Sequence, residues 1–163
     1  MSLPPDVRID PATERDVAAI LTLIKALAEY ERMSDDVIAD EAGVRASLFG
    51  SPPAAEVVIA RAGAEPVGFA LWFHNYSTFL GRRGLYLEDL FVVPGWRGRG
   101  VGRALLAHLA QVAVARNCGR MEWSVLNWNE PAIRFYRGLG AKPMDEWTVY
   151  RLSGDAIARL ADS

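Results

Sequence analysis

Three glycines spaced two residues apart mark the most informative segment of the chain. Gly98, Gly100 and Gly102 follow an apolar run over residues 85–93, and a helical pattern begins at Val101. Glycine adopts positive φ angles and lets the backbone approach a ligand closely. Successive N–H groups at the start of a helix form a concave site for anions, which the helix dipole reinforces. The segment therefore predicts a loop that holds a pyrophosphate group.

The residues around this turn distinguish between the kinds of phosphate-binding loop that it could form. Arg97, Arg99 and Arg103 would add positive charge around a bound pyrophosphate. A dinucleotide-binding fingerprint would need glycine or alanine at position 103 and an acidic residue about 20 positions later, where the nearest acid is Glu122. A Walker loop needs Gly-Lys-Ser/Thr, which the sequence lacks. An ordinary glycine turn between a strand and a helix stays open on the glycines alone.

A second segment gives the glycine turn a family context. Arg97-x-x-Gly100-x-Gly102 after an apolar strand resembles the acetyl-CoA-binding motif of the GNAT superfamily of N-acetyltransferases. Residues 128–136 (WNEPAIRFY), followed by Gly140-Ala141, resemble the second cofactor segment of that superfamily. The resemblance implies a GNAT fold with acetyl-CoA as co-substrate and no metal.

Two other segments narrow the resemblance to one branch. Residues 86–89 (YLED) and 23–31 (LIKALAEYE) are similar to the spermidine/spermine (diamine) acetyltransferases, and the whole resemblance spans residues 8–152. It implies transfer of an acetyl group to the primary amine of a small molecule, by direct attack in a ternary complex. Two alternatives remain: an enzyme that acetylates lysines or N-termini of proteins and peptides, and a non-catalytic CoA-binding regulatory module.

Acetylation of an amine requires a proton acceptor. A primary alkylamine has a pKa near that of lysine, so on the order of one molecule in 10³ is neutral at pH 7. Glu88 is the candidate acceptor, directly or through a water, because an unused carboxylate is costly inside an apolar strand. The resemblance places the substrate-amine glutamate at the same position; a salt bridge or an edge position is the alternative. Since neighbouring side chains of a strand alternate, Asp89 should face away from Glu88 and be structural.

The departing thiolate requires an acid, and the thioester oxygen requires a donor. Tyr136 is the candidate acid, since its hydroxyl is neutral at pH 7, and the resemblance assigns it this role; a core aromatic is the alternative. The resemblance also implies that backbone N–H groups near residues 91–93 bind the thioester oxygen. The presence of both Glu88 and Tyr136 argues against a non-catalytic module.

The resemblance implies which residues contact the two substrates. Those against the cofactor are Phe91, Val92, Val93, Arg97, Gly98, Arg99, Gly100, Val101, Gly102, Arg103, Asn129, Pro131, Ala132 and Tyr136. Those against the amine are Tyr30, Glu31, Glu88, Glu122, Trp123, Asp145 and Glu146. Asn129 has a helix N-cap as a second role, and the acidic residues have a solvated surface position as the alternative.

Arg82 and Arg83 depart from the branch pattern. They lie in a segment expected to overhang the substrate, where an arginine would hold a carboxylate. This difference disfavours long polyamines and favours amines that carry a carboxylate, such as lysine or thialysine.

The elements that must position these residues follow a β-α-α-β-β-β-α-β-α-β order, which predicts a mixed α/β sheet flanked by helices in a single domain over 1–163. Apolar positions three, four and seven apart predict the first long helix, and Thr13 with Asp16 predicts a capping box at its start. The expected strands are 7–9, 56–61, 67–76, 85–93, 121–126 and 147–152. The expected helices are 14–31, 41–49, 101–116, 129–139 and 155–160.

Composition excludes several classes of protein. With 18 basic and 20 acidic residues, the chain gives no reason to expect a nucleic-acid or membrane partner. Cys118 is the only cysteine, which excludes an intrachain disulfide, and His74 and His108 are too isolated to indicate a metal site. The N-terminus lacks the pattern of a signal peptide, so a cytoplasmic location is expected. The resemblance implies a homodimer, and the apolar residues 147–150 could pair with a partner subunit.

Overall fold

The computed structural model describes residues 3–163, and these form two compact units that divide after Ser124. The first unit holds the sheet, whose strands are β1 (Val7–Pro11), β2 (Glu56–Ala62), β3 (Glu65–Ser77), β4 (Arg82–Val92) and β5 (Met121–Trp123). Its helices are α1 (Val17–Tyr30), α2 (Glu41–Phe49) and α3 (Val101–Ala115). The second unit contains α4 (Glu130–Gly138) and α5 (Asp155–Ala161).

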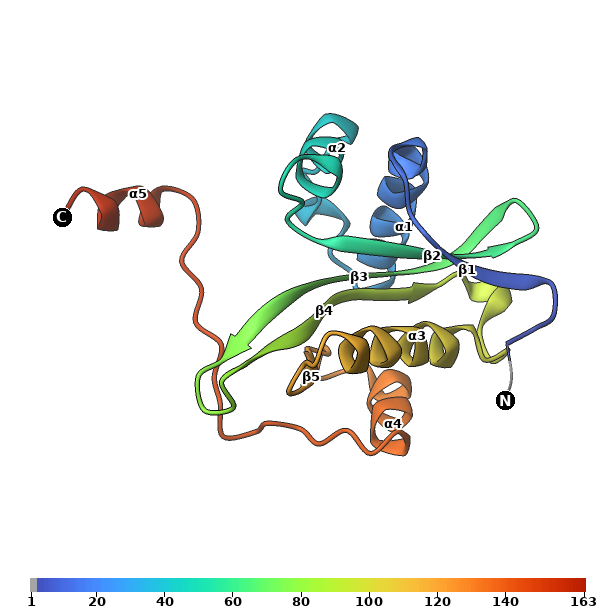
Figure 1. Cartoon of the computed structure of the whole chain (residues 1–163). Coiled ribbons are helices and arrows are strands. Elements are labelled where there is room, and N and C mark those ends of the chain that lie inside the picture. Colours follow the sequence, from blue (N-terminus) through green and yellow to red (C-terminus); the bar gives the residue numbers. More distant parts are fainter. Residues whose placement is uncertain (1–2) are drawn as a thin grey trace. The chain divides into compact units, whose positions relative to one another are not determined.

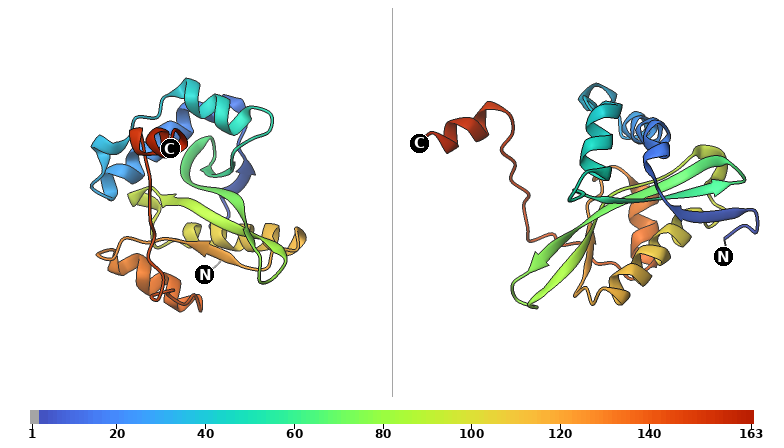
Figure 2. Two further views of the ribbon diagram at one scale, coloured as in Figure 1. Left: turned by 90° about the vertical axis from the view of Figure 1, so that its left-hand side faces the viewer. Right: turned by 45° about the horizontal axis from the view of Figure 1, so that its top comes forward.

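The sheet has the strand order β1-β2-β3-β4-β5. Strands β1 to β4 pair antiparallel with one another, and β5 runs parallel to β4 at one edge. Helices α1 and α2 lie on one face and α3 lies on the other (Figure 1), an arrangement that two further views also show (Figure 2). The expected α/β class, with a mixed sheet flanked by helices, is therefore confirmed.

The face below α1 and α2 contains the main core. Apolar residues of α1 repeat along one side, so they bury together against alternate residues of the strands. The buried cluster consists of Val17, Ile20, Leu21, Leu23, Leu27, Val44, Val57, Ile59, Phe69, Leu71 and Phe91. The expected capping box precedes α1, where the backbone N–H of Thr13 donates to Asp16 Oδ2 at 2.8 Å.

The opposite face of the sheet packs against α3. Leu105 and Leu109 of this helix are fully buried. Gly68 of β3 permits close packing here, because a Cβ atom at this position would lie 2.8 Å from the carbonyl oxygen of Phe91 and 3.5 Å from Leu105 Cδ1. Paired residues and alternate residues of a strand share one face of a sheet. Gly68 and Ala70, with their partners Val92 and Leu90, therefore belong to the face that packs against α3.

The expected strand over residues 147–152 is wrong. These residues form neither helix nor strand, and Val149 and Tyr150 are 81% and 92% exposed. A strand needs a neighbour for its backbone N–H and C=O groups, and the described chain offers this segment none. The expected helix after it is present as α5, whereas β5 is three residues shorter than expected.

Candidate functional site

A β-bulge in β4 sets the arrangement of the candidate catalytic carboxylates. Leu71 pairs with Asp89, but the next residue, Trp72, pairs with Leu87, so Glu88 is an extra residue in β4. Leu71 belongs to the core under α1, which places Asp89 on the α1 face. Glu88 is exposed and Asp89 is partly buried.

This bulge changes the roles expected for the two acids. Strict alternation would put Leu87 and Asp89 on the same face, yet their partners Trp72 and Leu71 lie on opposite faces. The expectation that Asp89 faces away from Glu88 depended on alternation, which does not hold here. Asp89, expected to be structural, is the carboxylate that the fold buries beside the end of α1.

Three carboxylates act on one another at this place. Burial, together with the charges of Glu88 and Glu31, raises the pKa of Asp89 to about 6. Burial also raises the pKa of Glu31, which caps the C-terminal end of α1. A cation bound among these groups would lower their mutual repulsion and replace part of their lost hydration.

We expect Asp89→Asn to stabilise the unliganded protein at pH 7.5 and not at pH 4. A carboxyl whose pKa is raised in the folded state costs no stability below its unfolded pKa near 3.9, and costs progressively more as pH rises through about 6. Removing the charge should gain about 1 to 2 kcal/mol at pH 7.5, after allowance for solvent screening. Thermal unfolding should then shift upward by about 3 to 6 °C.

The matched control for this measurement is Asp35→Asn, because Asp35 is exposed. Asp35→Asn should change the midpoint temperature of thermal unfolding little at either pH 7.5 or pH 4. A midpoint for Asp89→Asn at or below that of the wild type at pH 7.5 would contradict the burial of an ionised Asp89.

The glycine turn has the geometry of an anion cradle. Gly98 and Gly100 have φ angles of +73° and +84°, which other residues rarely adopt. Gly100 is the N-cap of α3, and no side chain caps the first N–H groups of this helix. Those groups point out of the helix start and are available to an anion.

Arg97 and Arg99 flank the turn with their guanidinium groups against aromatic rings. The Arg97 guanidinium lies 4.7 Å from the ring centroid of Tyr30 and 5.3 Å from that of Phe91, and Arg97 Nε donates to the Val92 carbonyl at 2.9 Å. Arg99 lies 4.8 Å from the ring of Trp96. The side chain of Arg97, expected at the pyrophosphate, thus contacts the end of α1, which the sequence did not indicate.

Strand β4 is unpaired along part of one edge. Its parallel pairing with β5 ends at Leu87 and Trp123, whereas β4 continues to Val92. Within residues 3–163, no strand pairs with that edge beyond Leu87. This edge of β4 thus has no neighbouring strand over residues 88–92, an arrangement suited to binding a pantetheine arm.

The expected amine-binding residues differ in their surroundings. Tyr30 and Glu31 lie at the end of α1, on the side of Asp89. Glu122 accepts hydrogen bonds from Arg120 Nε at 2.9 Å and Asn75 Nδ2 at 3.1 Å, so its charge is already compensated. Trp123, beside it in β5, is partly buried.

Arg82 and Arg83 begin β4, at the end of the strand opposite the glycine turn. Glu88 is five to six residues away, which corresponds to about 17 to 20 Å along a strand. The two arginines thus start well away along the strand from the candidate proton acceptor. Their expected role in holding a substrate carboxylate stays a prediction.

The second unit contains the remaining candidates. Asn129 is buried, and its Oδ1 accepts from the backbone N–H of Ala132 at 3.4 Å, so the N-cap role is confirmed. Pro131 occupies the first turn of α4, and Tyr136 lies near its end, with its ring 5.5 Å from that of Phe135. Asp145 and Glu146 are exposed and, with Pro143 and Met144, line a cavity of about 340 Å³.

Two kinds of feature are absent from the part of the chain that the structure describes. No group of three or more His, Cys, Asp or Glu side chains in 3–163 has an arrangement that would hold a metal ion. No helix in the same range combines the length and apolar character needed to cross a bilayer.

Sheet order, glycine turn and unpaired β4 edge define the class of protein. The Acetyltransferase (GNAT) family matches residues 19–141, and the chain belongs to this family. The expected superfamily and its small-amine branch are thereby confirmed, as is its activity class, an N-acetyltransferase.

Similar proteins refine this result. Thialysine N-epsilon-acetyltransferase of Bos taurus is 39% identical over 95% of this chain and 97% of its own length. L-ornithine N5-acetyltransferase NATA1 of Arabidopsis thaliana is 32% identical over 94% of this chain and 87% of its own. Among solved structures, integron cassette protein VCH_CASS6 of V. cholerae has a TM-score of 0.82 and 27% identity, covering 98% of this chain and all of that one.

Proposed function

We propose that this protein transfers the acetyl group of acetyl-CoA to the side-chain amine of a small basic amino acid. The observation that carries the proposal is the set of three carboxylates at the β4 bulge, where the charges of Glu31 and Glu88 both act on Asp89. An ammonium group fits this set by charge. The thialysine and ornithine enzymes reported above act on compounds that carry an amine on a short side chain, which supports the same substrate class.

The proposed reaction is direct attack within a ternary complex. Glu88 or Asp89 accepts a proton from the bound ammonium group, and the neutral nitrogen attacks the thioester carbonyl carbon. The C–S bond breaks as the N–C bond forms, and CoA leaves as a thiolate. The attacking nitrogen then loses a second proton to solvent, which gives the amide. Tyr136 donates its hydroxyl proton to that sulfur and is later reprotonated from solvent.

Other chain groups bind and orient the reactants in this proposal. Backbone N–H groups of residues 91–93 bind the thioester oxygen, which gains negative charge during attack. The N–H groups at the start of α3 hold the pyrophosphate of CoA, with Arg99 and Arg103 adding positive charge. Asn129, Pro131 and Ala132 add contacts to the cofactor from the start of α4.

The test is release of free thiol from acetyl-CoA across an amine panel. The panel contains thialysine, lysine, ornithine, diaminopropane, spermidine, spermine and a lysine peptide. We expect the highest kcat/KM with one of the three amino acids. Preference for a polyamine would replace the substrate class, preference for the peptide would favour a protein acetyltransferase, and acetyl-CoA binding without turnover would favour a non-catalytic module.

We further propose that the protein is a cytoplasmic homodimer. Residues 147–152 are exposed and carry apolar or aromatic side chains on both alternating sets, with Trp147 77% and Val149 81% exposed on one and Tyr150 92% and Leu152 55% on the other, a composition that suits pairing with a strand. Strand β5 is an open edge of the sheet in the described chain. In the proposed dimer, a second copy of the chain supplies a pairing strand for segment 147–152, for the open edge at β5, or for both.

Light scattering after size exclusion tests this assembly. The wild type should elute with twice the mass of its 17.9 kDa chain. Val149→Asp, which places a charge in the exposed segment, should yield monomer, whereas Lys142→Asp, at an exposed position outside it, should not. A monomeric wild type would exclude the dimer.

A further inference from the structure

The face of the sheet that carries Asp89 extends across β4 to β5. Alternate residues of a strand share a face, so Phe73 lies on the same face as Leu71, which pairs with Asp89. Phe73 pairs with Tyr86 of β4, and Tyr86 pairs with Glu122 of β5. Glu122 and the proposed amine site therefore lie on one face of the sheet, within the first unit.

The register sets the distance between these two acids. Leu71 and Phe73 are two residues apart, which corresponds to about 7 Å along a strand, and neighbouring strands lie about 4.8 Å apart. The two components are perpendicular, so the Cα atoms of Asp89 and Glu122 are about 8 Å apart. In lysine, the carboxylate and the side-chain nitrogen are joined by as many bonds as two residues of extended backbone contain, so they lie about 7 Å apart. A single amino acid of this size therefore reaches both positions.

Two aromatic rings line the same face next to Glu122. The ring centroids of Phe73 and Tyr86 are 5.2 Å apart, and both side chains are partly buried. The hydroxyl of Tyr86 lies 3.0 Å from Ser124 Oγ, which fixes the position of its ring. The rings give the face an apolar surface against which the methylene groups of a basic amino acid can pack.

Arg120 and Asn75 hold Glu122 by one of its two carboxylate oxygens. Arg120 Nε lies 2.9 Å from Glu122 Oε1, and Asn75 Nδ2 donates to the same oxygen at 3.1 Å. The backbone of Arg120 is fixed beside β4, because Leu85 N–H donates to its carbonyl at 2.9 Å. No hydrogen bond within residues 3–163 engages Glu122 Oε2 or the terminal nitrogens of Arg120, whose side chains are 35% and 44% exposed. The pair therefore presents a carboxylate oxygen and a guanidinium edge side by side.

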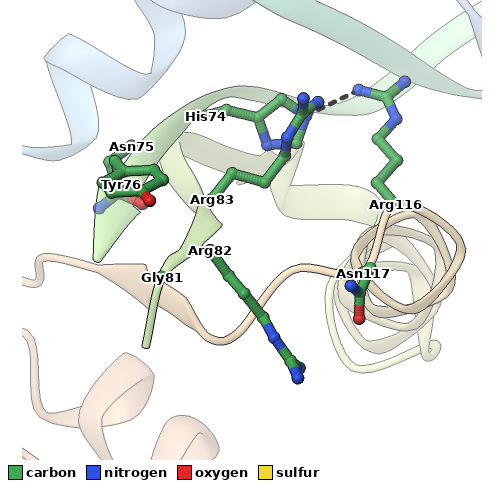
Figure 3. A pocket seen from close by; sticks show the side chains of 8 residues that line it. All are labelled: His74, Asn75, Tyr76, Gly81, Arg82, Arg83, Arg116 and Asn117. Atoms are coloured by element: carbon green, nitrogen blue, oxygen red, sulfur yellow. Dashed lines mark hydrogen bonds between the residues drawn. The ribbon is translucent and has the colours of Figure 1, made fainter. Parts of the chain in front are cut away.

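Other arginines near this end of the sheet do not present such an edge. Arg82 and Arg83 are neighbours in β4, so their side chains leave opposite faces of the sheet, and they point apart in Figure 3. Arg116 is occupied by its ion pair with Glu56, to which both of its terminal nitrogens donate. Arg120 is therefore the arginine best placed beside an acid on the face of Asp89.

We infer that Arg120 and Glu122 bind the α-carboxylate and α-ammonium groups of an amino acid whose side-chain amine lies at Asp89, an inference that rests on the proposed function. A guanidinium group binds a carboxylate through two parallel N–H groups. Arg120 and Glu122 together carry no net charge, so they suit a zwitterion better than the second ammonium group of a diamine. The pair thus selects amino acids over diamines of the same length.

Steady-state kinetics with lysine and with cadaverine, which is lysine without its carboxylate, test this inference. Arg120→Gln should raise the KM for lysine at least tenfold and leave kcat nearly unchanged, because the lost charge-assisted hydrogen bond lies away from the reacting atoms. The KM for cadaverine should stay the same or fall, since Glu122 is then left to bind the second ammonium group. Turnover of cadaverine also shows that the variant is folded. Arg45→Gln, at an exposed position on α2, is the matched control and should keep both KM values.

The wild type gives a second measurement that needs no variant. Lysine amide carries a neutral carboxamide in place of the carboxylate, so its KM should exceed that of lysine at least tenfold. Equal KM values for the two compounds would overturn the inference.

The outcomes separate this inference from the proposed function. If the wild type acetylates lysine, and Arg120→Gln keeps its KM for lysine or raises the KM for lysine and cadaverine alike, the inference is overturned and the proposed function stands. A loss confined to lysine in Arg83→Gln instead would assign the carboxylate to the arginines at the start of β4 and would also overturn it. A wild type that acetylates no amino acid would overturn the proposed function, and this inference with it.

Discussion

Replacement of Tyr136 by Phe should lower kcat about 10²-fold while leaving the affinity for acetyl-CoA nearly unchanged. The change removes one hydroxyl and keeps the ring, so the packing against Phe135 within α4 is preserved. Loss of a positioned acid typically costs 10²- to 10⁴-fold, and protonation of a thiolate, a good leaving group, belongs at the low end.

Two readouts separate this chemical role from a structural one. Single-turnover kinetics should show the full decrease, because the step that is slowed is breakage of the C–S bond. Titration with CoA should give an affinity within about twofold of the wild type. Unchanged kcat would exclude Tyr136 as the acid, and a large loss of CoA affinity would make it a packing residue.

Replacement of Gly100 by Val should weaken acetyl-CoA binding at least tenfold. Gly100 has φ +84°, a conformation that a β-branched residue adopts at a cost of about 1 to 3 kcal/mol. The added side chain would also occupy space beside the N–H groups at the start of α3, where the pyrophosphate is expected. Equilibrium titration with acetyl-CoA measures the effect directly.

Gly95→Ala is the matched control for Gly100→Val. Gly95 precedes the same turn, has no positive φ angle, and an added Cβ there would contact nothing within 4 Å. Its acetyl-CoA affinity should equal that of the wild type. If Gly100→Val folds and binds acetyl-CoA normally, the cradle has been assigned to the wrong segment.

Much of the fold follows from local sequence signals. The α1 stripe, the capping box at Thr13 and the glycines at the start of α3 each have a local physical cause, and the structure has all three. The segment 147–152 has an equally clear strand pattern, yet it forms no strand. Local pattern specifies that a segment suits a sheet, whereas a strand also requires a partner that periodicity cannot identify.

The candidate site was harder to predict for a similar reason. A bulge depends on the register of two strands, so nothing in residues 86–89 alone indicates that Glu88 is an extra residue or that Asp89 lies below α1. Stacking of Arg97 on Tyr30 joins residues 67 positions apart, which spacing within a motif cannot reveal. The arginine pair at the start of β4 was visible in the sequence, but only its position in the sheet separates it from the carboxylates.

The side chain of Arg97 has a consequence for how the two substrates bind. It starts from the turn proposed to hold acetyl-CoA and ends on the ring of Tyr30, at the helix terminus that borders the carboxylates. A ligand that shifts the turn must also move this guanidinium or the ring beneath it. The two binding free energies are then coupled, and such coupling is reciprocal: whatever factor acetyl-CoA contributes to amine affinity, the amine contributes to acetyl-CoA affinity.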